Sequence, residues 1–212
     1  MERAFFRKPE KSDYLSPHLD VAQNTATAAT AWKGNPVLRT TGDPYNTAIV
    51  PESFNHGDDG GTRLGQTFIP DTDFKLREIS LYVGDGLGTI EYKPVTLALY
   101  EFDECGAKRN IDSSYTAGKN LLGDGLRINY KPQAQGLLQV RLAESRQPVL
   151  KAGRRYVLEL QGVRGSAPLF WRRTPTDAYP AGAAYQDRSL IQGESKTVDF
   201  GLALYGETHR GQ

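Results

Sequence analysis

The chain has 212 residues, with 26 lysines and arginines against 25 aspartates and glutamates. That length fits one large β domain, or one medium domain with an arm. The balanced charge argues against a general nucleic-acid binder and against electrostatic attachment to an anionic membrane. No apolar run reaches the roughly 18 residues of a transmembrane helix, so we expect no membrane insertion.

The first residues and the cysteine content bear on compartment and chemistry. MERAFFRKPEKSDY is charged and lacks the apolar stretch of a secretory signal. Either the protein is cytoplasmic, or it has a leader that is not part of this sequence. The single cysteine, Cys105, excludes an internal disulfide and a thiolate zinc cluster.

Residues 1–63 are rich in turn formers and carry only isolated apolar anchors. They predict an extended N-terminal arm packed on the rest of the chain, with a short strand at Thr47–Val50. VAQNTATAATAWKG is compatible with a short helix, although its threonines and weak apolar face oppose one.

From Leu64 onward, apolar residues alternate with polar ones, which is typical of strands with one face in a core. Turn sequences such as GDGLG, GDG and PTDAYPAG separate these runs. The pattern predicts an all-β, antiparallel, jelly-roll-like sandwich over residues 64–207, followed by a tail at 208–212. The expected strands lie in LGQTFIP, FKLREISLYVG, PVTLALYEF, GLLQVRLA, RRYVLELQG and TVDFGLALYG.

Four short sequence motifs follow one another along the predicted strands and loops. A GQTF strand comes first, an L-x-A-G-x-x-Y element stands at Leu150–Tyr156, a Y-x-x-G-x-x-Y loop at Tyr179–Tyr185, and a D-F pair at Asp199–Phe200. This order resembles the jelly-roll or galactose-binding-like accessory modules, of the carbohydrate-binding kind, found on bacterial extracellular proteins. The resemblance covers about two thirds of the chain. It implies an accessory domain associated with carbohydrate, in an extracellular or cell-surface protein, and carries no catalytic residues. A cytoplasmic location stays open.

The segment around PLFWRR contains aromatic, arginine and aspartate side chains, which are the types that bind sugars. A sugar ring has an apolar C–H face and a rim of hydroxyls. Strand parity predicts that Trp171 points outward if Phe170 is buried. The alternative is that Trp171 fills the core while the arginines lie at a solvated edge. The candidate ligand-binding residues are Trp171, Arg172, Arg173, Asp177, Tyr179, Tyr185 and Asp187.

Two acidic loops are candidate sites for a structural calcium ion, which binds carboxylate and carbonyl oxygens. NHGDDGG offers Asp58 and Asp59, and IPDTDF offers Asp71 and Asp73. Neither loop matches an EF-hand. The resemblance favours calcium, and solvated turns capped by the aspartates are the alternative.

Catalysis has less support in the sequence. Carboxylates on neighbouring strands could pair as in a glycosidase, but nothing selects one pair. A lyase would use a Tyr base beside an Arg or Gln, and the strand motifs of jelly-roll lyases are missing. We therefore predict a non-catalytic carbohydrate-binding or accessory module whose partners are a glycan and a neighbouring domain or subunit. The alternatives are a small jelly-roll polysaccharide-degrading enzyme and an assembly subunit with a docking arm.

Overall fold

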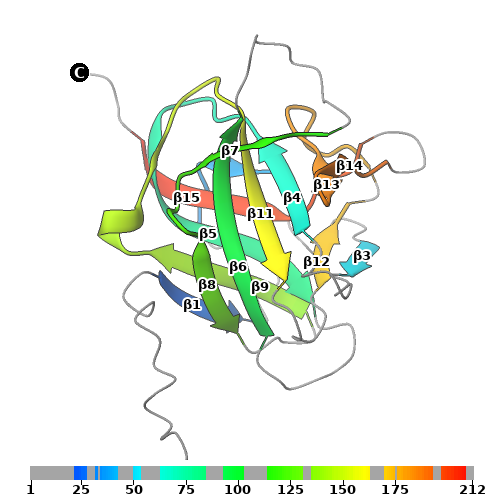
Figure 1. The fold of residues 1–212 in the computed structure, drawn as a ribbon, viewed down its shortest axis with the longest axis horizontal. Helices are drawn as coiled ribbons and strands as arrows, with labels where there is room; N and C mark the ends of the chain where they lie inside the picture. Colours follow the sequence, from blue (N-terminus) through cyan, green and yellow to red (C-terminus); the bar gives the residue numbers. More distant parts are fainter. Residues whose placement is uncertain are drawn as a thin grey trace, which may run out of the picture.

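The computed structural model describes residues 22–27, 32, 34–42, 50–53, 63–84, 93–102, 114–130, 135–162, 170–174, 176–192 and 197–208. Within them the chain forms two antiparallel β-sheets packed face to face, with β6, β11 and β4 in front of β5, β9 and β15 in Figure 1. The predicted all-β sandwich is confirmed. In the described part of the chain, the helical structure is a single 3-10 turn at Glu144–Arg146, and no helix there is long and apolar enough to span a membrane.

The first sheet has eight strands in the described residues and is organised around the eleven-residue strand β5. Strands β9 and β10 pair with one edge of β5, and β15 and β12 pair with the other. The outer positions belong to β1 on β9, β3 on β12 and β2 on β15. The strands are β1 (Ala22–Thr27), β2 (Leu38–Arg39), β3 (Val50–Ser53), β5 (Phe74–Gly84), β9 (Gln135–Leu142), β10 (Val149–Leu150), β12 (Phe170–Arg173) and β15 (Leu202–Thr208).

The second sheet has seven strands in the described residues, in the order β14–β13–β4–β11–β6–β7, with β8 also paired to β6. Its centre is β11, which pairs with β4 on one edge and with β6 on the other. The strands are β4 (Arg63–Phe68), β6 (Lys93–Phe102), β7 (Ala117–Asn120), β8 (Leu126–Tyr130), β11 (Tyr156–Gly162), β13 (Ala184–Gln186) and β14 (Ser189–Leu190).

Period-two alternation puts one face of each long strand into the core. In β11 the inward side chains are Tyr156, Leu158 and Leu160, all buried, and the outward positions include Glu159. In β5 the inward phase changes between Leu76 and Ile79, where the pairing with β15 shifts register at Tyr205/Gly206. Such a β-bulge admits one extra residue, so both halves of the long strand can keep their apolar faces inside.

The first 63 residues contribute β1, β2 and β3 to the first sheet. The short helix considered for VAQNTATAATAWKG is wrong for Ala22–Thr27, which is a strand paired with β9, and residues 28–31 and 33 lie outside the described ranges. Threonine is β-branched and suits a strand better than a helix, and pairing satisfies the backbone. The strand expected at Thr47–Val50 is found at Val50–Ser53, and residues 47–49 lie outside the described ranges.

One residue of the N-terminal segment covers part of the outer face of the first sheet. Trp32 is buried against Tyr82, Leu137 and Ala203, and its indole N–H donates to the carbonyl of Gly42 at 2.8 Å. The opposite side of the molecule, the outer face of the second sheet, carries a different group of aromatic and polar side chains, and the candidate site lies there.

Candidate functional site

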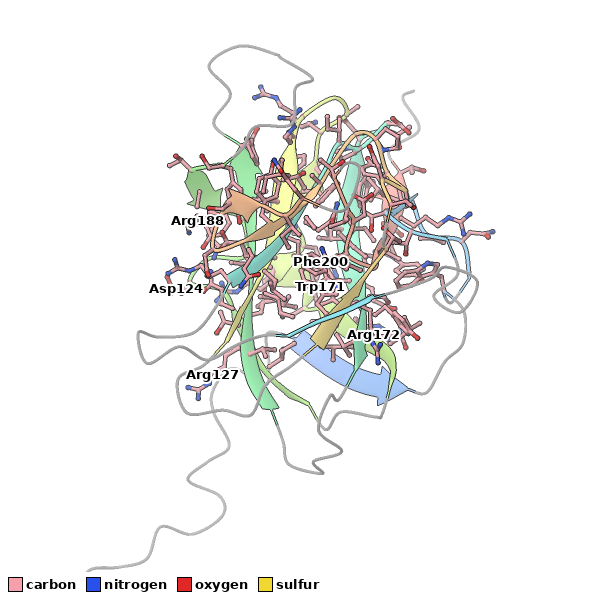
Figure 2. The ribbon with its side chains drawn as sticks, turned by 90° about the vertical axis from the view of Figure 1, so that its right-hand side faces the viewer. Asp124, Arg127, Trp171, Arg172, Arg188 and Phe200 are labelled. Carbon is pink, nitrogen blue, oxygen red and sulfur yellow. The ribbon has the colours of Figure 1, made fainter. Side chains whose placement is uncertain are left out.

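Trp171 lies in the core, so the alternative that it fills the core is correct and the outward-facing indole is wrong. Its exposed fraction is 0%, and its ring stacks on Phe200 with centroids 4.7 Å apart. The indole N–H donates to the carbonyl of Gly201 at 2.9 Å. Figure 2 shows both rings between the sheets. Because Trp171 pairs with inward-facing Val83, the phase of β12 directs the indole into the sandwich.

The other candidate residues do not gather around Trp171. Arg172 and Arg173 are half-buried in β12, and Tyr179 is half-buried with its hydroxyl donating to the carbonyl of Ile69 at 2.9 Å. Tyr185 is buried on the outer face of the second sheet, and exposed Asp187 accepts a hydrogen bond from the backbone N–H of Arg63 at 2.9 Å. The residues predicted as one site are therefore divided between the core, a loop and a sheet face.

A buried carboxylate, Asp199, holds the loop that contains Asp177 and Tyr179. Its Oδ2 accepts from the backbone N–H groups of Ala178 and Tyr179 at 2.9 and 2.8 Å, and its Oδ1 accepts from Gln66 at 2.9 Å. Burial raises the pKa of Asp199 to about 7, although these three donors act in the opposite direction. Both carboxylate oxygens of Asp199 accept hydrogen bonds from within the protein, so we assign Asp199 a structural role.

The acidic loops leave the calcium hypothesis as a prediction. Asp73 is bound to Lys151 Nζ at 2.8 Å and to the backbone N–H of Ala152 at 2.8 Å, whereas Asp71 is exposed. Asp58 and Asp59 lie outside the described residues. The residues that the structure does describe contain no group of three or more metal-ligating side chains. A fall in melting temperature on chelation would support a calcium ion.

The outer face of the second sheet carries a connected polar group, the Glu159 cluster, made of Tyr115, Glu159, Gln161 and Arg188. Glu159 is fully buried although it points away from the core. Its Oε1 accepts from the Tyr115 hydroxyl at 2.5 Å and from Arg188 Nε at 2.9 Å. Its Oε2 accepts from Gln161 Nε2 at 2.8 Å. A buried charge is tolerated when it is paired and hydrogen-bonded in this way.

Small neighbours make room for this carboxylate. In register with Glu159 lie Gly65 on β4 and Ala98 on β6. A Cβ atom at Gly65 would lie 2.7 Å from the Tyr115 hydroxyl oxygen, so the glycine lets the tyrosine lie across the strand. Glycine in a strand often marks such a close approach.

Arg188 reaches the cluster from the tight turn between β13 and β14. Asp187 and Arg188 have φ angles of 48° and 65°, a left-handed conformation that non-glycine residues seldom adopt. Two successive residues of positive φ match the twist of a two-residue hairpin turn. The ion pair with Glu159 offsets the cost of holding an arginine there.

The charge states follow from these contacts. Burial, and then the negative charge of Glu159, raises the pKa of Tyr115 far above its usual value. The hydrogen bond to Glu159 raises the pKa of Arg188. Tyr115 therefore stays protonated as a donor and is a poor general base. The cluster is suited to holding these side chains in place.

Two aromatic rings on β6 border the Glu159 cluster. Tyr100 and Phe102 are half-buried, with the guanidinium of Arg188 5.9 Å from the Tyr100 ring centroid and that of Arg155 5.5 Å from the Phe102 centroid. Gln161 Nε2 also donates to the Tyr100 hydroxyl at 3.4 Å. Part-exposed rings thus lie beside the Gln161 amide and the Arg188 guanidinium, whose positions are fixed by their hydrogen bonds to Glu159.

Sequence reasoning missed this site, although one signal was present. Glu159 and Gln161 alternate with Leu158 and Leu160, which places a charge and an amide outward on a central strand. Nothing local indicates that Tyr115, 44 positions away, or Arg188, 29 positions away, meets Glu159.

Comparison with known proteins adds no assignment to this geometry. No protein-family model matches the chain, and no curated protein matches it either. The likeness to carbohydrate-binding accessory modules therefore remains a prediction.

Proposed function

We propose that the chain is a non-catalytic accessory module that binds carbohydrate on the outer face of its second sheet. One observation carries the proposal: part-exposed Tyr100 lies beside Arg188 and Gln161, both bonded to buried Glu159. The Arg188 guanidinium lies over the ring, 5.9 Å from its centroid, so a sugar ring would pack on the part of the tyrosine that stays exposed while its hydroxyls meet the amide and guanidinium groups. The proposal includes an extracellular or cell-surface location, because the accessory modules that the sequence resembles belong to secreted proteins.

The rigidity of the site supports this function. Gln161 and Arg188 are already ordered by their bonds to Glu159, so binding would immobilise few further side chains. The raised pKa of Tyr115 keeps its hydroxyl protonated as a donor to Glu159, which helps to hold the site in place. A docking role for the arm stays a separate hypothesis, because most of residues 1–63 lie outside the described residues.

The test is retardation of the full chain in native gels containing single soluble polysaccharides, both neutral and acidic. Tyr100→Ala is expected to weaken binding about tenfold or more, as for an aromatic residue central to an interface. Tyr100→Phe keeps the ring and should keep most of the binding. Tyr205→Ala is the matched control, because Tyr205 is a part-exposed tyrosine on the outer face of the other sheet.

Melting temperatures of all variants separate lost binding from lost folding. The proposal fails if no polysaccharide retards the wild-type chain. It also fails if Tyr100→Ala and Tyr205→Ala weaken binding equally.

A further inference from the structure

A row of polar side chains crosses the outer face of the second sheet beside the Glu159 cluster. The strand register puts Arg63 opposite Gln161, Gln161 opposite Thr96, and Thr96 opposite Arg127. Directly opposed residues of antiparallel strands share a face. Because Gln161 faces outward with Glu159, the whole row lies on that face, and both end arginines are exposed. Figure 2 shows Arg127 and Arg188 along one side of the sandwich.

The charge along the strands of this face is one-sided. Among the described outward-facing side chains, the acidic one is Glu159, which is buried and already bonded to Tyr115, Arg188 and Gln161. Two further acids, Asp124 and Asp187, lie in turns at the margin of the sheet. Asp187 uses Oδ1 to accept the backbone N–H of Arg63, and Asp124 lies near the same side in Figure 2. The exposed charges of the row itself are therefore the guanidinium groups of Arg63 and Arg127.

The spacing of the row constrains what it can bind. Arg63 and Arg127 lie three strand spacings apart, or about 14 Å between backbones. One carboxylate cannot span that distance, so each arginine is available to a separate anionic group. Between them, Gln161 and Thr96 offer neutral donors and acceptors. Guanidinium groups bind carboxylates in bidentate geometry.

We infer that the carbohydrate ligand is an acidic polysaccharide. Arg63 binds one of its carboxylates and Arg127 binds another, and Gln161 and Thr96 form hydrogen bonds to the hydroxyls between them. This inference rests on the proposed function and narrows it to one class of glycan. Arg188 is not a third anchor of equal strength, because its charge is balanced by Glu159.

The experiment compares polygalacturonate with its fully methyl-esterified form, which has the same backbone without the charge. We expect the full chain to bind the acid at least tenfold more tightly than the ester, and added salt to reduce the difference. Arg63→Ala and Arg127→Ala should each weaken binding to the acid about tenfold. Arg141→Ala is the matched control, an exposed arginine on the outer face of the first sheet.

Each outcome decides between the two proposals. If the ester or neutral polysaccharides bind as tightly as the acid, and the arginine variants bind like wild type, the acidic ligand is rejected while the proposed function stands. If no polysaccharide binds, both are rejected. If a single-stranded thymidine oligonucleotide binds as tightly as polygalacturonate, the surface recognises polyanions in general, which overturns the assignment to a glycan.

Discussion

The guanidinium of Arg188 lies 2.9 Å from the carboxylate of Glu159, which has no exposed side-chain surface although it points away from the core. The pair joins the tip of the β13–β14 hairpin to the central strand of the second sheet. Removing one partner of a buried ion pair leaves an uncompensated charge, which costs about 3 to 5 kcal/mol. Loss of either partner should therefore lower stability strongly. Unfolding measured without ligand separates this effect from ligand binding.

Replacing Arg188 tests the balance between ion pair and backbone strain. Arg188→Ala should lower the free energy of unfolding by about 2 to 3 kcal/mol, below the fully buried case because the arginine is partly exposed. Arg188→Gly should cost about 1 kcal/mol less than Arg188→Ala, since glycine adopts a φ of 65° without strain. Urea unfolding measures both. Equal losses for the two variants would contradict strain at this turn.

The contact over Gly65 predicts a non-additive pair of substitutions. Gly65→Ala should destabilise the fold by about 1 to 3 kcal/mol, because its Cβ atom would crowd the Tyr115 hydroxyl. Tyr115→Phe removes that hydroxyl and the bond to Glu159. The double variant should lose less stability than the sum of the single losses. Strict additivity in a double-mutant cycle would show that the two residues do not touch.

Asp199 predicts a specific pH dependence of stability. Its pKa is about 7 in the folded protein, against 3.8 for an unperturbed side chain. Between about pH 4 and pH 7, the folded state therefore binds more protons at Asp199 than the unfolded state does. Asp199 therefore adds a few kcal/mol to the free energy of unfolding below pH 4, and this contribution is lost as the pH rises through 7.

The comparison variant is Asp199→Asn, which cannot titrate. The free energy of unfolding of wild type should fall relative to this variant between pH 5 and pH 8, whatever constant cost the amide adds beside Gln66. Parallel stability curves for the two proteins would mean that the carboxyl has an ordinary pKa despite its burial.

Trp171 should behave as a core residue. Trp171→Ala should lower the free energy of unfolding by about 3 to 5 kcal/mol, because the buried indole stacks on Phe200 and bonds to the carbonyl of Gly201. Trp171→Phe should cost less, since it keeps a ring in the same space. Retained melting temperature together with lost glycan binding in Trp171→Ala would instead restore the indole as a ligand contact.

Much of the sandwich could be predicted because strand formation is encoded by near neighbours. The run FKLREISLYVG coincides with β5, and the alternating Leu158 and Leu160 are buried as expected. Shorter strands such as β7, β8, β13 and β14 were not predicted, because a few residues carry too little alternation to be recognised.

Periodicity by itself determined that the chain forms sheets with one apolar face each, since residues two apart in an extended chain share a side. It left open which of the two sides is inside wherever both carry large apolar groups, as at Phe170 and Trp171. The tertiary structure decided that phase through the pairing of Trp171 with Val83. It also decided the site, because the meeting of Tyr115, Glu159 and Arg188 depends on strand order and register, which are set by packing of the whole chain and by no local pattern.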